Sequence, residues 1–365
     1  MPSRHRAAFT ALLAAALFGA TTPLAKALLG SLPPFLLAGL FYLGSGTGLA
    51  VVILVRRIMQ RGVAQPAEPA GPQRFPLRDV PWLAGAIAAG GVAGPVLLML
   101  GLGTTPAATA SLLLNLEGVF TALIAWLVFR ENVDAPVFLG MLAIVAGGVV
   151  LSWQPGTAAT AGLPAGALLV AGACACWAVD NNLTRKVSMH DATFIACVKG
   201  LVAGSVNVAL ALAFGASWPH GTGTHPASVA LAMLTGFAGY GVSLVLFVVA
   251  LRNLGTARTG AYFSVAPLFG VTLAWLLWPE LPTRQFWLAA ALMALGVWLH
   301  IRERHEHTHT HEALDHTHRH RHDAHHQHEH DFAWNGEEPH THPHHHAPLT
   351  HTHAHFPDIH HRHTH

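Results

Sequence analysis

Charged side chains are scarce in the first 301 residues, and this shortage excludes a soluble protein of that size. Only 10% of the whole chain is charged, whereas 52% is hydrophobic. A soluble body of about 300 residues needs many more charges to cover its surface. Apolar runs of about 20 residues, the length that spans the ~30 Å core of a bilayer, account for the shortage. The sequence therefore predicts an integral membrane protein.

Other absences narrow the function. Cys174, Cys176 and Cys197 are the three cysteines, and all lie in apolar runs, which excludes a disulfide framework or a zinc site made of cysteines. No G-x-x-x-x-G-K-[ST] pattern is present, so an ATP-binding loop of that type is excluded. No Ser/His/Asp set or soluble catalytic domain indicates an enzyme. The protein is not expected to be an enzyme or to require a cofactor.

Ten apolar segments have the length and composition of membrane-spanning helices. The first follows a basic start that resembles a signal peptide, but its apolar run continues to Leu29, so we expect it to be retained. The expected spans are 8–29, 32–55, 80–102, 107–129, 136–153, 164–184, 192–214, 228–251, 259–278 and 285–301.

The basic residues predict an orientation for these spans. Alternate connections carry almost all of the Arg and Lys, and the opposite set carries only Arg284. Cytoplasmic connections are enriched in these residues. We therefore expect a multi-pass protein of the cytoplasmic (inner) membrane with both termini in the cytoplasm.

An internal repeat divides the spans into two halves of five. "FTALIAWLVFRE" (120–131) aligns without gaps with "FGVTLAWLLWPE" (269–280), and "LFGATTPLAK" (17–26) parallels "CWAVDNNLTR" (176–185). Because five is odd, the second half enters the membrane from the opposite side. This inverted repeat is associated with alternating access around a site near the midplane. The expected units are 1–153, 154–301 and a tail, 302–365.

Ten helices in two inverted repeats, with "LLLNLEGVFTALIAWLVFRE" in the fourth span, resemble the EamA-type transporters of the drug/metabolite transporter superfamily. The resemblance implies an all-α secondary transporter that exports small metabolites or amphipathic compounds. One departure is visible: Pro267 occupies the position in the ninth span where the family commonly has a proline, but the fourth span has Glu117 and Gly118 there.

Four ionisable residues lie inside the expected spans: Lys26, Glu117, Asp180 and Lys199. Each costs roughly 2.5–3.5 kcal/mol at a helix centre, so such residues usually face a cavity or a partner. Glu117 lies near the midplane next to Asn115, and a carboxylate removed from water holds a proton more readily, as proton coupling requires. The alternative is that Glu117 only holds helices together.

A second polar group lies in the sixth and seventh spans. Asp180 and Lys199 are expected to form an ion pair, either structural or in contact with substrate, and Asn181 and Asn182 add hydrogen-bonding groups beside it. Lys26, near the outer end of the first span, is a further transport candidate, and the favoured alternative is that it snorkels to the headgroups.

Aromatic residues and glycines in the spans are expected to serve packing. Trp177 and Tyr240 could line an amphipathic pocket but are ordinary in spans. The G-x-x-x-G spacings in "GSGTG" (44–48), "GGVAGP" (90–95) and "GLVAG" (200–204) allow helices to approach closely.

The tail contains 24 of the 29 histidines, many of them as His-x-His. Neutral imidazoles at alternate positions suit Zn, Ni, Co or Cu. The candidate ligands are His305, His307, His309, His311, His316, His318, His320 and His322. The composition predicts a disordered segment. An alternative is that it binds metal only because histidine generally does.

Three functions are consistent with these features. The first is a metabolite or drug exporter with a metal-binding regulatory or buffering tail. The second is a divalent-metal exporter whose tail collects cargo, although its spans have few metal ligands. The third is a membrane-tethered metal-storage or sensing protein. The expected partners are the bilayer, a small-molecule substrate and divalent ions, without nucleic acid, and a homodimer is compatible with the sequence.

Overall fold

The structure is a computed structural model. It describes residues 4–60, 75–128, 135–153, 164–187, 191–216, 226–254, 262–301, 306–311, 314–320, 340–346 and 349–354. The chain divides into two compact units, Met1–Arg302 and Glu303–His365, and each is described by itself.

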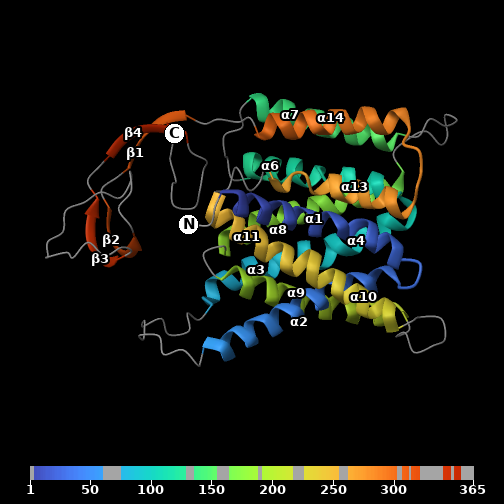
Figure 1. Cartoon of the computed structure of the whole chain (residues 1–365), viewed down its shortest axis with the longest axis horizontal. Helices are drawn as coiled ribbons and strands as arrows, with labels where there is room; N and C mark the ends of the chain where they lie inside the picture. Colours follow the sequence, from blue (N-terminus) through green and yellow to red (C-terminus); the bar gives the residue numbers. More distant parts are fainter. Residues whose placement is uncertain are drawn as a thin grey trace. The chain divides into compact units, whose positions relative to one another are not determined.

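Helices make up the described secondary structure of the first unit (Figure 1). In chain order they are α1 (Arg4–Leu28), α2 (Pro34–Gln60), η1 (Leu77–Asp79), α3 (Val80–Ala86), η2 (Ile87–Ala93), α4 (Gly94–Thr104), α5 (Ala107–Leu113), α6 (Leu116–Leu127), α7 (Ala135–Ser152), α8 (Ala165–Val187), α9 (Ala192–Ala213), α10 (Pro226–Gly236), η3 (Phe237–Val242), α11 (Ser243–Leu254), α13 (Ala266–Leu277) and α14 (Arg284–Ile301).

Eight of these helical stretches are long and apolar enough to cross a membrane, within the described residues. They coincide with the first eight expected spans; the seventh, for example, was expected at 192–214 and is Ala192–Ala213. The ninth and tenth correspond to the shorter apolar helices Ala266–Leu277 and Arg284–Leu299. Part of the ninth expected span, 259–261, lies outside the described residues.

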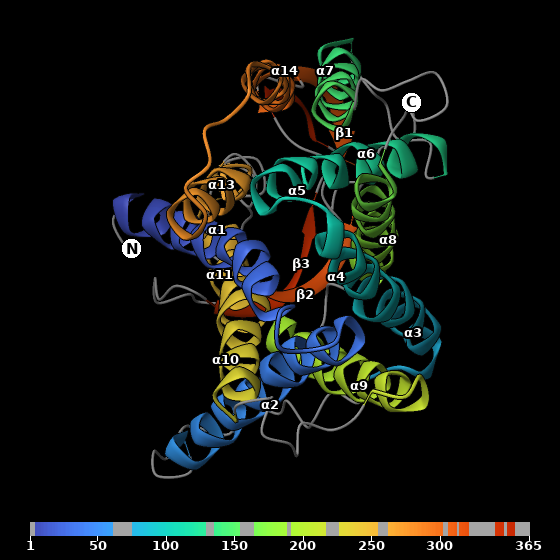
Figure 2. The same ribbon diagram turned by 90° about the vertical axis from the view of Figure 1, so that its right-hand side faces the viewer.

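The helices pack in matched pairs. α2 packs along α9 and α7 packs along α14, and these two pairs lie at opposite edges of the bundle in both views (Figures 1 and 2). Between them, α1 contacts α11 and α13, while α8 contacts α4 and α6. A large cluster of buried apolar side chains, including Phe41, Met99 and Ile144, joins helices from both edges.

Glycine makes the α2–α9 crossing close. A Cβ on Gly46 would lie 2.4 Å from the Leu201 nitrogen, and one on Gly200 would lie 2.5 Å from the Gly46 nitrogen. Only a residue without a side chain permits two backbones to approach this closely. The packing role predicted for the glycines at 44–48 and 200–204 is confirmed here.

Two helices contain a turn of π-helix, which the sequence analysis did not predict. The turns are η2, between α3 and α4, and η3, between α10 and α11. A π turn holds an extra residue and disturbs the regular i→i−4 hydrogen bonds around it. Carbonyls in such a turn become available to side-chain donors from other helices.

The fourth helix is interrupted even though it lacks a proline there. α5 ends at Leu113 and α6 begins at Leu116, and the Asn115 side chain donates a hydrogen bond of 2.9 Å to the Leu112 carbonyl. Asn competes in this way for backbone groups, which favours a turn over a continuous helix. The corresponding interruption in the ninth helix lies just before Pro267 at the start of α13.

The second unit contains four β-strands, whereas the sequence predicted a disordered tail. They are β1 (Glu306–His311), β2 (Leu314–His320), β3 (His340–His346) and β4 (Leu349–Ala354). β1 pairs antiparallel with β4, and β2 pairs antiparallel with β3 (Figure 1). The His-Thr alternation has the two-residue period of a strand, and Thr is favoured in strands, which explains the difference.

Candidate functional site

Glu117 is hydrogen-bonded across the two halves of the bundle. It lies close to the middle of the stretch Ala107–Leu127, in the first turn of α6. The Asn181 amide on α8 donates to Glu117 Oε1 at 2.8 Å and also lies 3.4 Å from the Thr121 hydroxyl. A carboxylate in the membrane interior thus has a neutral hydrogen-bond donor as its direct partner.

Asp180 and Lys199 form the ion pair expected from the sequence. The Lys199 ammonium lies 2.5 and 2.7 Å from the two carboxylate oxygens of Asp180. Thr184, one turn further along α8, donates to Asp180 Oδ1 at 2.8 Å. Both charged side chains are nearly buried, so each charge depends on the other for compensation.

The π turn η2 supplies two carbonyls to side chains from three other helices. The Gly90 carbonyl accepts from the Tyr42 hydroxyl at 2.7 Å and from the Trp177 indole at 3.0 Å. The Gly91 carbonyl accepts from the amide of Asn207, which is fully buried, at 2.9 Å. These donors tie α2, α8 and α9 to the turn, so buried backbone carbonyls are not left unsatisfied.

Gly90 also brings the π turn against the ion pair. A Cβ at this position would lie 2.0 Å from Asp180 Oδ2. The glycine therefore allows the carboxylate to lie directly on the η2 backbone. The hydrogen bonds at the Gly90 carbonyl and the Asp180–Lys199 pair belong to one polar cluster.

The polar cluster lies beside aromatic side chains from both halves of the chain. The rings of Tyr42 and Tyr240 have centroids 5.2 Å apart, and Phe18 lies 6.2 Å from Tyr240. Glu117 is connected to this region through Asn181, the neighbour of Asp180 in α8. The centre of the bundle thus combines a carboxylate, a compensated ion pair and aromatic surface.

Three buried side-chain atoms of the described helices have no hydrogen-bond partner: Thr22 Oγ1, Ser111 Oγ and Asn207 Oδ1. Buried polar atoms are normally satisfied by protein or by water. Asn207 Oδ1 is the one that belongs to the polar cluster, because its amide nitrogen binds η2. It can accept a hydrogen bond from a water or from a ligand.

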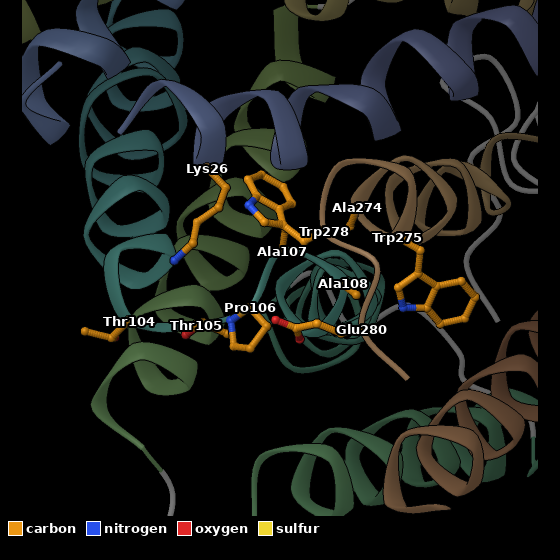
Figure 3. Close-up of a pocket in the computed structure, with 10 residues that line it drawn as sticks. All are labelled: Lys26, Thr104, Thr105, Pro106, Ala107, Ala108, Ala274, Trp275, Trp278 and Glu280. Carbon is orange, nitrogen blue, oxygen red and sulfur yellow. The ribbon is translucent and has the colours of Figure 1, made fainter. Parts of the chain in front are cut away.

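A separate pocket of about 250 Å³ lies where α1, α4, α5 and α13 meet (Figure 3). Lys26 reaches into it from α1, and its ammonium donates to the carbonyls of Leu102 and Gly103 near the end of α4. Trp278 and Glu280, which follow α13, also line it. Carbonyls at a helix C-terminus attract a cation, which accounts for this contact, and snorkelling of Lys26 to the headgroups stays a prediction.

The structure brings some predicted site residues together and separates others. Glu117 and Asn181 meet, and Asp180 and Lys199 meet. The Asn182 amide donates to Ala178 at 2.9 Å and lies 3.4 Å from the Thr121 carbonyl, so it joins α8 to α6. Asn115 serves the helix interruption and approaches Met293 Sδ at 3.9 Å rather than Glu117.

Tyr42 and Thr121 take part in the site but were not identified from the sequence. Tyr42 belongs to no motif, and a tyrosine in an apolar span indicates packing. Thr121 lies in the repeated segment 120–131, where nothing distinguishes it from its neighbours. The glycine pair at 90 and 91 was the available signal, although its spacing was assigned to helix packing alone.

Among the described helices, no group of three or more His, Cys, Asp or Glu is placed to hold a metal ion. The candidate ligands in the tail occupy positions in β1 and β2, except for His305 and His322, which lie outside the described residues. The strand register places them opposite residues of β3 and β4.

Comparison with known proteins agrees with this architecture. The chain is 30% identical over 211 residues to an uncharacterized transporter of Methanothermobacter thermautotrophicus, which is 57% of this chain and 60% of that relative. The match thus spans less than two thirds of the relative's length. A crystal structure with 21% sequence identity superposes with a TM-score of 0.55 over 82% of this chain and 97% of the other, which supports the fold.

Two segments of the chain match the same family. Residues 5–153 and residues 164–302 each match the EamA-like transporter family. Together the two segments include all of the described helices apart from the first residue of α1. With eight membrane-length apolar helices in the described part of the chain, this is a multi-pass membrane protein, and it belongs to the EamA-like transporter family.

Proposed function

We propose that this protein is a secondary transporter that exports small metabolites or amphipathic compounds across the cytoplasmic membrane by alternating access. The hydrogen bond between Glu117 and Asn181 carries the proposal, since it joins the two halves through a carboxylate near the middle of the bundle. Ionisable residues at membrane depth mark substrate or ion pathways. The surrounding aromatic side chains suit a cargo with apolar surface.

The packing of the helices supports two inverted repeats of five spans, 1–153 and 154–301. The contact of α1 with α13 has a counterpart in the contact of α8 with α6. Gly90 in one π turn packs against Asp180, and Gly239 in the other packs against Thr21, the residue aligned with Asp180 in the repeat. The distribution of basic residues supports a cytoplasmic location for both termini.

Proton exchange at Glu117 is the proposed coupling step. The ionised carboxylate accepts the hydrogen bond from Asn181 strongly, because charge-assisted hydrogen bonds are the stronger ones. Protonation removes that charge and weakens the connection between α6 and α8. Because the halves must separate and meet again during alternating access, the proton can thus bias one conformation over the other.

The tail is proposed to bind divalent metal ions and to regulate or buffer. Its histidines suit Zn, Ni, Co or Cu, and those ions would remain outside the transport path. A divalent-metal exporter is the second candidate, favoured by the same histidines. A membrane-tethered metal store or sensor is the third.

One comparison separates the three candidates. Cells that express the full chain, the chain without residues 302–365, or Glu117→Gln are challenged with a panel of amphipathic drugs, metabolites and divalent metals, with membrane expression measured for each. The proposal predicts resistance to an organic compound that survives loss of the tail but requires Glu117. Metal resistance that disappears with the tail would instead support metal export. If Glu117→Gln changes no resistance and every effect depends on the tail, the store or sensor would be supported.

A further inference from the structure

The strand register of the tail places histidine opposite histidine in both strand pairs. In β1 and β4, His307 stands opposite His353 and His309 stands opposite His351. In β2 and β3, the opposite pairs are His316 with His344, His318 with His342, and His320 with His340. In β1 and β4, Thr308 stands opposite Thr352 between the two histidine pairs, and Thr310 stands opposite Thr350 next to the second pair.

These pairs share one face of each ribbon. Directly opposite residues of an antiparallel pair lie on the same face, with Cβ atoms about 4.5–5.5 Å apart. Residues two apart along a strand also share a face and are separated by about 6.5 Å. The four positions 307, 309, 351 and 353 therefore form a compact square on one face of the first ribbon, and the threonines occupy the other face.

We propose that the opposed histidines form zinc sites shared between the two ends of the tail. A square of four histidines matches the four nitrogen ligands that a closed tetrahedral zinc site uses, with Zn–N distances of about 2.0–2.1 Å. The inference rests on the proposed metal binding by the tail and adds its ligand sets. It assigns a role to His340, His342, His344, His351 and His353, which the His-x-His motifs of residues 305–322 did not include.

Zinc sites shared between two strands would link those strands, whereas sites within one strand would not. If each His-x-His motif bound metal by itself, residues 307 and 309 would form one site and residues 351 and 353 another. In the shared arrangement, one ion needs ligands from both strands. Zinc would then hold residues 306–320 to residues 340–354, because binding free energy at such a site is also folding free energy.

Zinc titration of the full-length protein in detergent tests the arrangement. Tightly bound Zn²⁺ is counted by competition with a chromophoric chelator for the wild type, His307→Asn/His309→Asn, His351→Asn/His353→Asn, and the variant with all four changes. We expect each double variant to lose the same number of tight ions as the quadruple variant. Thr308→Asn/Thr352→Asn, on the opposite face of the same ribbon, is the matched control and should lose none.

The other results are equally informative. Losses that add, so that the quadruple variant loses as many ions as the two double variants combined, would overturn the shared sites but leave metal binding by the tail intact. No loss from His351→Asn/His353→Asn would also overturn them. A wild-type protein without tight zinc would overturn metal binding by the tail itself, and none of these outcomes bears on transport by the helical part.

Discussion

The Lys199 ammonium lies within 2.7 Å of both carboxylate oxygens of Asp180, and this pair connects α8 to α9 beside the π turn η2. The two side chains expose only 10% and 13% of their surface, so each charge has lost most of its hydration. Removing one member of a buried pair leaves the other uncompensated.

Asp180→Asn and Lys199→Gln should each destabilise the folded protein by about 3–5 kcal/mol. The double variant should lose less than the sum, because it leaves no uncompensated charge. Thermal unfolding in detergent measures all three. Additive losses would mean that the two charges do not stabilise each other. A charge swap is a poorer test, because a lysine at position 180 would collide with η2 at Gly90.

Gly90→Ala should destabilise the protein by about 1–3 kcal/mol, the usual cost of overpacking. Its Cβ would lie 2.0 Å from Asp180 Oδ2, so either the carboxylate or the turn must move. Gly118→Ala is the control, because nothing lies within 4 Å of a Cβ there and alanine favours a helix. Equal unfolding temperatures for the two variants would contradict the close contact at Gly90.

Tyr42→Phe and Trp177→Phe should each cost about 0.5–1.5 kcal/mol, since either donor alone can still satisfy the Gly90 carbonyl. The double variant should cost more than the sum of the two, because the carbonyl then becomes a buried acceptor without a partner. Chemical unfolding monitored by circular dichroism provides the comparison. If the loss of stability in the double variant equals the sum of the two single losses, the two donors do not share the Gly90 carbonyl as a common acceptor.

Glu117→Gln should preserve the fold and leave only slow transport, too slow to confer resistance, whose rate no longer depends on pH. Glutamine keeps an oxygen that accepts from Asn181, but it cannot exchange a proton. The rate of export of a compound identified in the resistance screen is measured in vesicles between pH 5.5 and 8. Asp191→Asn is the control, because asparagine also caps α9 at its bond to the Phe194 nitrogen. An unchanged pH profile for Glu117→Gln would exclude the coupling role.

Hydropathy predicted the helices well because a span must satisfy all of its backbone groups internally, and only long apolar helices do so here. The expected span 136–153 and the helix Ala135–Ser152 differ by one residue at each end. The Asp180–Lys199 pair was also predictable, because two opposite charges at a similar depth in the membrane have few other partners.

The π turns and the strand pairs could not be predicted in this way. Apolar side chains continue through Ile87–Ala93 just as they would in an α-helix, so composition does not reveal the change in hydrogen bonding. Tyr42 therefore gave no sign that it would bind a carbonyl there. In the tail, polar composition indicates disorder, and the two-residue period of His and Thr is compatible both with metal binding and with a strand.

The π turn η2 also affects how relatives of this chain can be compared. An α-helix rotates by about 100° per residue, so an inserted residue would turn all later side chains by that angle. A π turn absorbs the extra residue, and the later side chains keep their direction. A relative with an ordinary α-helix in this place would be one residue shorter between α3 and α4, yet its later side chains would face the same neighbours. A single-residue gap within Ile87–Ala93 is thus compatible with an unchanged site, whereas the same gap in α8 would rotate Asp180 away from Lys199.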